Sequence, residues 1–186
     1  MSLRVISGKA KGLRLKTIKS LQTRPTADRI KESLFSIIAP LLHKAIVLDL
    51  FAGTGALGIE ALSRGADFAV FIDNSRESIN VIKENINHTG FEQNTEVYLN
   101  DYDGAIKLLA KRDKKYDIVF LDPPYGKGLE IKAADSIIKN NLLSNKGIII
   151  IETEEVLENR LVGVTKVDER SYGRTKLSFF EREKKD

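Results

Sequence analysis

Two kinds of hydrophobic pattern alternate along most of this chain. Short β-rich runs that are apolar on both faces are typical of buried parallel strands, and apolar residues at every third or fourth position are typical of helices that bury one face. The first pattern predicts strands at residues 46–50, 68–73, 96–99, 116–121 and 147–152. The second predicts helices at residues 56–63, between 74 and 90, and at 102–111 and 133–139. This alternation predicts an α/β fold with a doubly wound parallel sheet.

A hairpin and a helix are predicted before the sheet begins. Residues 4–7 and 13–17 have the pattern of short strands, and they flank a basic turn that is bounded by glycines. A helix begins near Pro25, with Thr26 as a candidate cap, and Pro40 marks its end or a kink. The face expected to pack on the body contains Ile30, Leu34, Ile37, Ile38 and Leu41. The basic residues of this segment, Arg24, Arg29 and Lys31, need not share that face.

Capping and turn residues mark two further boundaries. Asn74, with Glu77 three residues later, has the pattern of a capping box, and Gly90 is expected to end the helix that starts there. Near the end of the chain, residues 165–169 and 177–181 are predicted to form two strands around a polar turn.

The turn after the first strand of the sheet has the pattern G-x-G-x-x-G, formed by Gly53, Gly55 and Gly58. This pattern favours a nucleotide-type ligand, with Asp73 at the end of the next strand as a partner for a ribose. No Lys or Arg lies between residues 46 and 63, whereas Asp49 does, so a pyrophosphate would be repelled. S-adenosylmethionine carries a sulfonium and an ammonium group and no phosphate. We therefore expect S-adenosylmethionine, with a nicotinamide dinucleotide as the alternative.

Acidic residues stand at the carboxyl ends of four predicted strands, namely Asp49, Asp73, Asp101 and Asp122. In doubly wound sheets, ligands bind outside these ends. The four carboxylates are therefore expected to surround one site.

The segment Asp122-Pro123-Pro124-Tyr125 follows the fourth strand. Each proline fixes its own φ and holds the preceding residue extended, so the loop is stiff. Asp122 and the main-chain carbonyls supply hydrogen-bond acceptors, and Tyr125 supplies a ring for stacking. This combination suits an amino group on a planar base, with its nitrogen lone pair directed at a methyl carbon.

Composition narrows the function classes. The 186 residues are 42% hydrophobic and 30% charged, which is typical of one globular domain. The absence of cysteine excludes disulfides and a cysteine nucleophile, and His43 and His88 suit solvated or capping positions, so we expect no metal. Neither a signal peptide nor a membrane span is expected, which favours the cytoplasm.

Basic residues are concentrated at the N-terminus. Residues 1–31 contain nine lysines and arginines and one acid, while the whole chain has a net charge of only +4. A basic arm on a mildly acidic body is typical of proteins that bind nucleic acid. A solvated basic face is the alternative.

Several motifs resemble known methyltransferases. Residues 49–55 and 122–125 resemble the cofactor motif and the [DNS]-P-P-[YFW] motif of amino-group methyltransferases that use S-adenosylmethionine. Four more stretches resemble the bacterial RsmD family, which methylates guanine N2 in 16S ribosomal RNA: residues 4–9, 23–29, 60–66 and 172–175. The resemblance covers essentially the whole chain in order.

This resemblance implies a Rossmann-like class I methyltransferase fold, with a seven-stranded sheet whose last strand is antiparallel and an N-terminal β-hairpin and helix in front of it. Residues 1–186 would form one methyltransferase domain, with residues 1–43 as a basic extension and residues 44–186 as the catalytic core. The implied partner is 16S rRNA within an assembling small ribosomal subunit.

The resemblance also implies roles for individual residues. The target base would contact Asp122, Pro123, Pro124 and Tyr125. The cofactor would contact Asp49, Phe51, Ala52, Gly53, Thr54, Gly55, Asp73, Asn74, Asp101 and Tyr102. Asp49 and the glycine turn would hold the methionine end, Asp73 the ribose, and either Asp101 or Asp103 the adenine. RNA would contact Arg4, Lys9, Lys11, Arg14, Arg24, Arg29 and Arg174.

Other functions stay open at this point. The residues 122–125 would also suit methylation of adenine N6 in DNA or RNA, or of a protein glutamine. A non-catalytic RNA-binding module with the same fold is an alternative of a different class.

Overall fold

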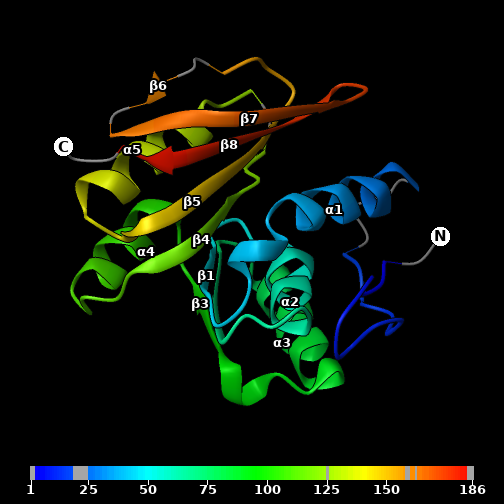
Figure 1. The fold of residues 1–186 in the computed structure, drawn as a ribbon. Coiled ribbons are helices and arrows are strands. Elements are labelled where there is room, and N and C mark those ends of the chain that lie inside the picture. The colour runs from blue at the N-terminus through cyan, green and yellow to red at the C-terminus, as the bar shows by residue number, and fades with distance from the viewer. Residues whose placement is uncertain (1–2, 19–24, 125, 158–159, 162, 184–186) are drawn as a thin grey trace.

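The computed structural model describes residues 3–18, 25–124, 126–157, 160–161 and 163–183. Within them, one twisted sheet has the strand order β3-β2-β1-β4-β5-β8-β7-β6 (Figure 1). Its strands are β1 (Ile46–Asp49), β2 (Phe68–Asp73), β3 (Thr95–Leu99), β4 (Tyr116–Leu121), β5 (Leu143–Thr153), β6 (Arg160–Leu161), β7 (Val164–Tyr172) and β8 (Thr175–Arg182). The first five strands are mutually parallel, as predicted, and β8 is antiparallel to β5.

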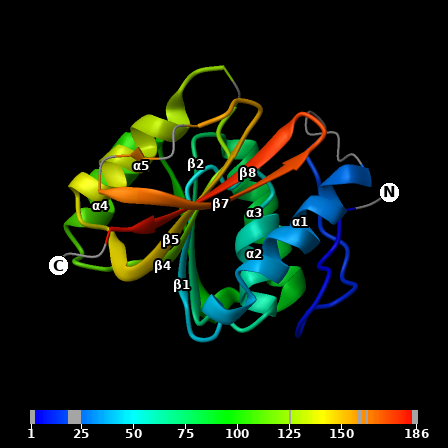
Figure 2. The same cartoon turned by 45° about the horizontal axis from the view of Figure 1, so that its top comes forward.

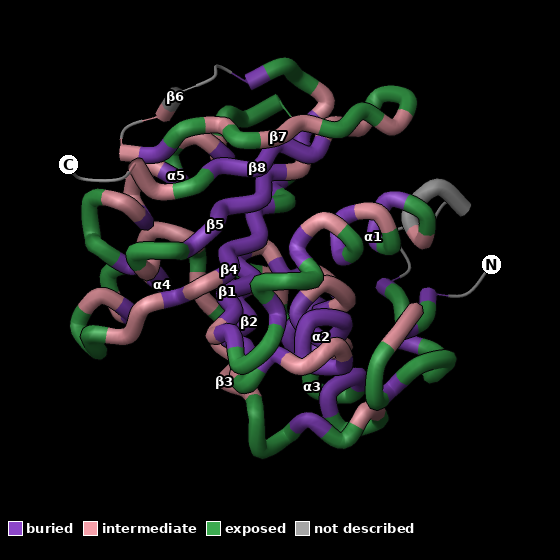
Figure 3. Tube along the Cα trace, in the orientation of Figure 1, coloured by how far each residue is buried: buried purple, intermediate pink, exposed green. Residues whose placement is uncertain are grey.

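Helices cover both faces of the sheet (Figure 2). They are α1 (Pro25–Ile37), α2 (Ala56–Ser63), α3 (Arg76–Thr89), α4 (Tyr102–Ala110) and α5 (Leu129–Lys139), with 3-10 turns η1 (Ala39–Leu41) and η2 (Glu92–Asn94). Alternate residues of each strand enter one of two apolar cores. One core lies against α1, α2 and α3, and the other lies against α4 and α5. The inner strands of the sheet and α2 are the most buried parts of the described chain, whereas β3 and β7 are more exposed (Figure 3).

The sheet has one strand more than the resemblance implies. The extra strand is β6, which has two residues and pairs only with β7 at the edge. Four elements are also clearly longer than predicted: β5 starts at Leu143, α5 starts at Leu129, β7 spans Val164–Tyr172 and β8 spans Thr175–Arg182.

The predicted cap of the third helix is wrong. Ser75, and not Asn74, caps α3, because the Ser75 hydroxyl accepts the Ser78 N–H. The Ser75 N–H donates to the carboxylate of Asp73. This bond keeps Asn74 and Ser75 outside the helix, so α3 starts one residue later than predicted. Asn74 is left exposed at the carboxyl edge of the sheet. Gly90 ends α3 with a φ of 76°, as predicted.

The N-terminal hairpin forms with less regular pairing than predicted. It has one isolated antiparallel bridge between Arg4 and Arg14, and the Gly12 N–H closes the turn on the Val5 carbonyl. The helix after it buries Ile30 and Leu34, and Ile38 is buried just after the helix ends, but Leu41 lies in the following 3-10 turn and is 39% exposed. The prediction for Leu41 is therefore wrong.

Candidate active site at the carboxyl edge of the sheet

The glycine turn connects β1 to α2 and is held by the end of the neighbouring strand. Gly53 and Gly55 have φ values of 54° and 77°, which favour glycine, and Gly55 begins α2. The Gly53 N–H donates to Asp73 Oδ2 at 2.8 Å. The third glycine of the pattern, Gly58, serves packing, because a Cβ there would lie 2.3 Å from the Phe71 ring. The turn therefore has a defined shape and a backbone that a ligand can approach closely.

Asp49 lies beneath this turn and is only 2% exposed. The Gly58 N–H donates to its Oδ2 at 3.1 Å. The pKa of Asp49 is raised to about 7, mainly because the group is buried; the Gly58 hydrogen bond lowers the pKa and the charge of the nearby Asp73 adds to the rise, and both effects are included in that value. A positive charge at this edge would stabilise the ionised form. The turn itself carries no lysine or arginine. These residues therefore fit the cationic methionine end of S-adenosylmethionine and not a pyrophosphate.

Two aromatic rings come from the segments that follow β1 and β3, the strands on either side of β2. Phe51 and Tyr102 have ring centroids 5.9 Å apart with planes tilted by 38°. Asp101 caps α4, since the Gly104 N–H donates to its Oδ1 at 2.8 Å, and Asp101 remains exposed. Asp103 instead accepts a hydrogen bond from Lys107 at 2.6 Å. Asp101 therefore keeps an exposed carboxylate just after β3, whereas Asp103 pairs with a lysine on α4.

Asp122 and the two prolines follow β4 directly. Pro123 is buried and Pro124 is exposed. Asp122 keeps solvent access at the mouth of a narrow cleft, yet the protein atoms around its carboxyl group raise its pKa well above the usual range. The charges of Glu152 and Asp49 raise it further. Tyr125 lies outside the described residues, as does Arg24.

The cleft around Asp122 contains residues that the sequence prediction missed. Its lining is Leu34, Leu57, Phe120, Leu121, Asp122, Ile150, Glu152 and Leu177. Glu152 is an acid near the end of a parallel strand, which is the same pattern that singled out Asp122, so the sequence did contain a sign of it. Leu34 and Leu177 come from α1 and β8, and only the tertiary structure brings them here.

The predicted RNA-binding residues are exposed where they are described. Lys9 and Lys11 lie in the turn of the hairpin, and Arg14 and Arg29 are also exposed. Arg4 forms an ion pair with Asp28 at 3.6 Å. Arg174 at the tip of the β7–β8 hairpin pairs with Glu154 at 2.8 Å. A hydrogen bond between the hydroxyl groups of Tyr172 and Ser33 connects this tip to α1.

Lys31 lies on the packed face of α1, although the sequence did not require the basic residues of this helix to share that face. It is 5% exposed, donates to the Arg4 carbonyl at 2.6 Å and lies 3.4 Å from the carboxylate of Glu60. Glu60 is fully buried in α2 and also accepts the N–H groups of Ile6 and Ser7. The lysine is buried because it helps to attach the N-terminal segment to α2.

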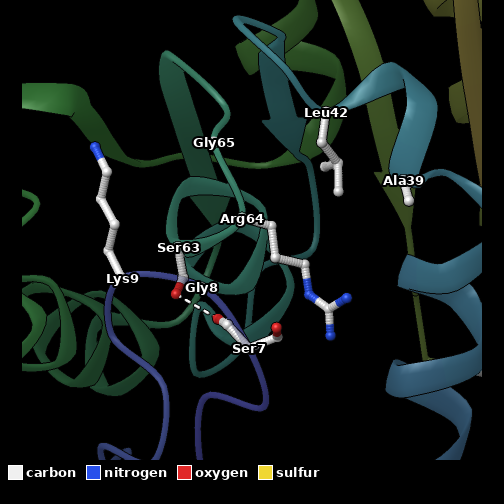
Figure 4. A pocket seen from close by; sticks show the side chains of 8 residues that line it. All are labelled: Ser7, Gly8, Lys9, Ala39, Leu42, Ser63, Arg64 and Gly65. Carbon is white, nitrogen blue, oxygen red and sulfur yellow. Dashed lines mark hydrogen bonds between the residues drawn. The ribbon is translucent and has the colours of Figure 1, made fainter.

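A hollow of about 440 Å³ lies at the opposite end of α2 from the glycine turn (Figure 4). The Arg64 side chain points into it, and Lys9 points away. Its lining is Ser7, Gly8, Lys9, Ala39, Leu42, Ser63, Arg64 and Gly65. Although it is roomier than the cleft at Asp122, it contains none of the acids at the strand ends, so we do not assign the reaction to it.

The described part of the chain has neither a membrane-spanning helix nor a cluster of metal ligands. No helix there is long and apolar enough to cross a membrane. No group of three or more His, Cys, Asp or Glu side chains there is arranged to hold a metal ion.

Known proteins resemble this chain over most of its length. A family model described as "Conserved hypothetical protein 95" matches residues 3–181. The Bacillus subtilis protein named "Putative rRNA methyltransferase YlbH" is 41% identical over 157 residues, which cover 84% of this chain and 85% of the relative. The Escherichia coli "Ribosomal RNA small subunit methyltransferase D" is 36% identical over 159 residues, covering 86% and 77%.

Solved structures agree with these matches. The "Putative methyltransferase yhhF from Escherichia coli" has a TM-score of 0.86 and 32% identity, with 98% of this chain and 99% of that chain covered. More distant structures are titled "A putative sam-dependent methyltransferase from Streptococcus mutans", at 17% identity, and "Crystal structure of SMU.776, a putative methyltransferase complexed with SAH", at 16%, and they show the fold alone. The fold is the Rossmann-like class I methyltransferase fold. From the family model and these relatives together, the chain belongs to the RsmD family.

Proposed function

We propose that this chain transfers the methyl group of S-adenosylmethionine to the exocyclic N2 amino group of a guanine in 16S rRNA. One observation carries the proposal. The glycine turn with its buried Asp49 and the Asp122-Pro123-Pro124 segment lie at the ends of two adjacent parallel strands, β1 and β4. A cationic methyl donor and an amino acceptor would therefore meet at one edge. The names of the relatives support ribosomal RNA as the substrate.

The proposed cofactor contacts follow the edge of the sheet. Asp49, Phe51, Ala52 and the turn Gly53, Thr54 and Gly55 hold the methionine end; Asp73 and Asn74 hold the ribose; Asp101 and Tyr102 hold the adenine. When bound, S-adenosylmethionine supplies an electrophilic methyl group beside Asp122. The absence of basic side chains from the turn, together with the raised pKa of Asp49, supports this cofactor over a dinucleotide.

The proposed role of Asp122 is to accept an N–H of the target amino group. An amino group conjugated to a purine is a weak nucleophile, and an acceptor that holds its N–H turns the nitrogen lone pair out of the ring plane. The carboxylate also stabilises the positive charge that develops on the nitrogen and accepts the proton that the methylated nitrogen loses. Positioning of this kind contributes roughly 7–11 kcal/mol to barrier reduction in favourable cases. Pro123 and Pro124 keep the acceptor rigid, and Tyr125 is proposed to stack on the base.

The proposed RNA contacts lie on both sides of this site. Residues 1–43 serve as a basic extension, with Arg4, Lys9, Lys11, Arg14, Arg24 and Arg29, and residues 44–186 serve as the catalytic unit, with Arg174 at its edge. We place the substrate within an assembling small ribosomal subunit. Exposed lysines and arginines would bind phosphates and release counterions.

The test is transfer of labelled methyl from S-adenosylmethionine to 16S RNA, offered free and in small subunits from cells that lack the enzyme, followed by nucleoside analysis. N2-methylguanosine is the expected product. Label found in adenine, DNA or protein would show that the methylated amino group is not guanine N2 but belongs to that other acceptor. Binding of RNA without transfer to any acceptor would favour the non-catalytic module.

Asp122→Ala separates catalysis from cofactor binding. We expect loss of methyl transfer with the affinity for S-adenosylmethionine unchanged within a few fold, because Asp122 faces the acceptor and not the donor. Asp67→Ala is the control, since Asp67 is an exposed acid near the opposite ends of the strands. If Asp122→Ala abolishes cofactor binding, Asp122 does not belong to the base site.

A further inference from the structure

Glu152 lies beside Asp122 because of the register between their strands. β4 and β5 are parallel, with Phe120 opposite Ile150 and Leu121 opposite Ile151. One more step of the same register places Asp122 opposite Glu152. Side chains two residues apart in a strand share a face, so Asp122 and Glu152 project on the face of Phe120 and Ile150, toward α1 and α2.

The two carboxyl groups line one cleft with apolar walls. Leu34 from α1, Leu57 from α2 and Leu177 from β8 are its other principal side chains. Placing two acids in such surroundings is unfavourable, and the charge of Glu152 is one cause of the raised pKa of Asp122. Hydrogen-bond donors from a ligand would relieve this repulsion. The cleft therefore suits a ligand that presents two neighbouring donors.

The edge of guanine that carries N2 has this property. Its N1–H and its N2 amino group are adjacent donors, whereas adenine presents its N6 amino group beside an unprotonated N1. Parallel strands are about 4.8 Å apart, so acceptors on two adjacent strand ends can reach adjacent atoms of one base edge. A second carboxylate would repel the N1 lone pair of adenine.

We infer that Glu152 determines base specificity by accepting the N1–H of the target guanine while Asp122 faces its N2 amino group. This inference rests on the proposed guanine N2 methylation. It adds a residue to the site that neither the motifs nor the names of the relatives assign, and it explains how a D-P-P-Y site could prefer guanine to adenine.

The experiment uses RNA with either guanine or 2-aminopurine at the methylated position, once that position has been mapped. 2-Aminopurine keeps the N2 amino group and lacks the N1–H. The wild-type protein should prefer guanine in kcat/KM by roughly 10- to 100-fold. Glu152→Gln should reduce this preference to within a few fold, because its amide can donate to the bare N1 of 2-aminopurine. Its affinity for S-adenosylmethionine should not change.

Two more variants make the result interpretable. Glu155→Gln removes an equal charge from an exposed position just after the same strand and should keep the wild-type preference. Glu152→Asp keeps a carboxylate acceptor on a shorter side chain, so its kcat/KM on guanine should fall while guanine is still preferred to 2-aminopurine. A merely structural role for Glu152 would not predict that Glu152→Gln loses this preference and Glu152→Asp keeps it.

An unchanged preference in Glu152→Gln would overturn the inference, and so would an equal loss on both bases with cofactor binding intact. If Glu152→Gln does not fold, loss of the guanine preference in a folded Glu152→Asp protein would overturn it instead. If the wild-type protein makes no N2-methylguanosine, the proposed function itself fails and the inference fails with it.

Discussion

At the scale of single residues, one buried carboxyl group, that of Asp49, stands out at the site. Asp49 has only one described hydrogen-bond donor, the Gly58 N–H, and almost no contact with solvent. An ionised carboxylate in such a place costs free energy unless a positive charge lies near it. The raised pKa of Asp49 reflects this free-energy cost of ionising the carboxyl group in the protein without ligand. Asp49 therefore lowers the stability of the free protein, and we expect it to raise the affinity for a cationic ligand.

Asp49→Asn should stabilise the free protein in a pH-dependent way. Because the pKa of Asp49 is about 7 in the folded chain and near 4 when unfolded, stability is lost as the pH rises through this window. Asparagine has no such loss and can still accept the Gly58 N–H. At pH 8 its free energy of unfolding should exceed that of the wild type by up to about 4 kcal/mol.

Urea unfolding at pH 5 and pH 8 measures this difference. The gap between the variant and the wild type should widen as the pH rises, while titration calorimetry shows weaker binding of S-adenosylmethionine to the variant. Parallel stability curves at the two pH values would contradict the account of Asp49.

The pH dependence of methyl transfer should report on Asp122. Its acceptor role requires the carboxylate, and its pKa is raised, so kcat/KM should fall as the pH drops through that raised value. Glu152→Gln removes one of the charges that raise this pKa and should move the acidic limb to lower pH. Profiles of the two proteins, with Glu155→Gln for comparison, measure the shift. An acidic limb at the same pH in all three would speak against coupling between Asp122 and Glu152.

At the scale of elements, polar contacts attach the N-terminal hairpin to α2 and α3. The Lys9 N–H donates to the Ser63 carbonyl at 2.8 Å, and Ser63 Oγ donates to the Ser7 carbonyl at 2.5 Å. Asn85 of α3 is almost fully buried and donates to the carbonyls of both Lys16 and Thr54, so one amide bridges the hairpin segment and the glycine turn. These contacts hold the basic segment against α2 and α3.

Two glycines of the hairpin allow a matched test of this docking. Gly8 and Gly12 have nearly equal φ values of 85° and 86°. A Cβ at Gly8 would lie 1.8 Å from the Ser63 carbonyl oxygen, whereas a Cβ at Gly12 would meet nothing within 4 Å. Both alanine variants carry the left-handed strain of roughly 1–2 kcal/mol. Gly8→Ala should cost a further 1–3 kcal/mol or so through the clash.

Urea unfolding gives the two costs, and hydrogen exchange shows whether residues 3–18 lose protection in Gly8→Ala alone. Equal destabilisation by the two alanines would mean that the hairpin can move away from α2 without loss.

Charge is unevenly distributed at the scale of the whole molecule. The exposed lysines and arginines of the N-terminal segment lie on the side of the sheet that α1, α2 and α3 cover (Figure 1). The opposite side, formed by α4 and α5, carries exposed lysines such as Lys111, Lys132 and Lys139. If RNA binds the first side, equal changes of net charge on the two sides should have different effects.

Replacement of Lys9, Lys11 and Arg14 by alanine should weaken RNA binding and reduce the slope of log K against log salt by about 2–3, because up to three phosphate contacts are lost. The control replaces Lys111, Lys132 and Lys139 by alanine and should keep the wild-type slope. Binding titrations at several salt concentrations measure both. The same slope in the two triple variants would identify the N-terminal basic residues as a solvated face.

The sequence predicted most of the parallel sheet and both motifs, because each signal is local. The acids Asp49, Asp73, Asp101 and Asp122 follow runs whose apolar pattern marks buried strands, and parallel topology then brings their ends to one edge. The misplaced cap at Asn74 shows the limit of this reasoning. The cap of α3 depends on the carboxylate of Asp73. One of its oxygens accepts the N–H of Ser75, two residues later, and the other accepts the N–H of Gly53 in the distant glycine turn.

What the sequence alone determined is the class of chemistry. Strand, glycine turn and helix in series, a turn free of basic side chains, and an acid followed by two prolines together specify an α/β methyltransferase site. The tertiary structure alone decided that Lys31 is buried against Glu60, that Asn85 joins the N-terminal segment to the glycine turn, and that Glu152 stands opposite Asp122. These contacts join distant segments or depend on strand register, and the physical reason is that burial and register arise only when the layers pack together.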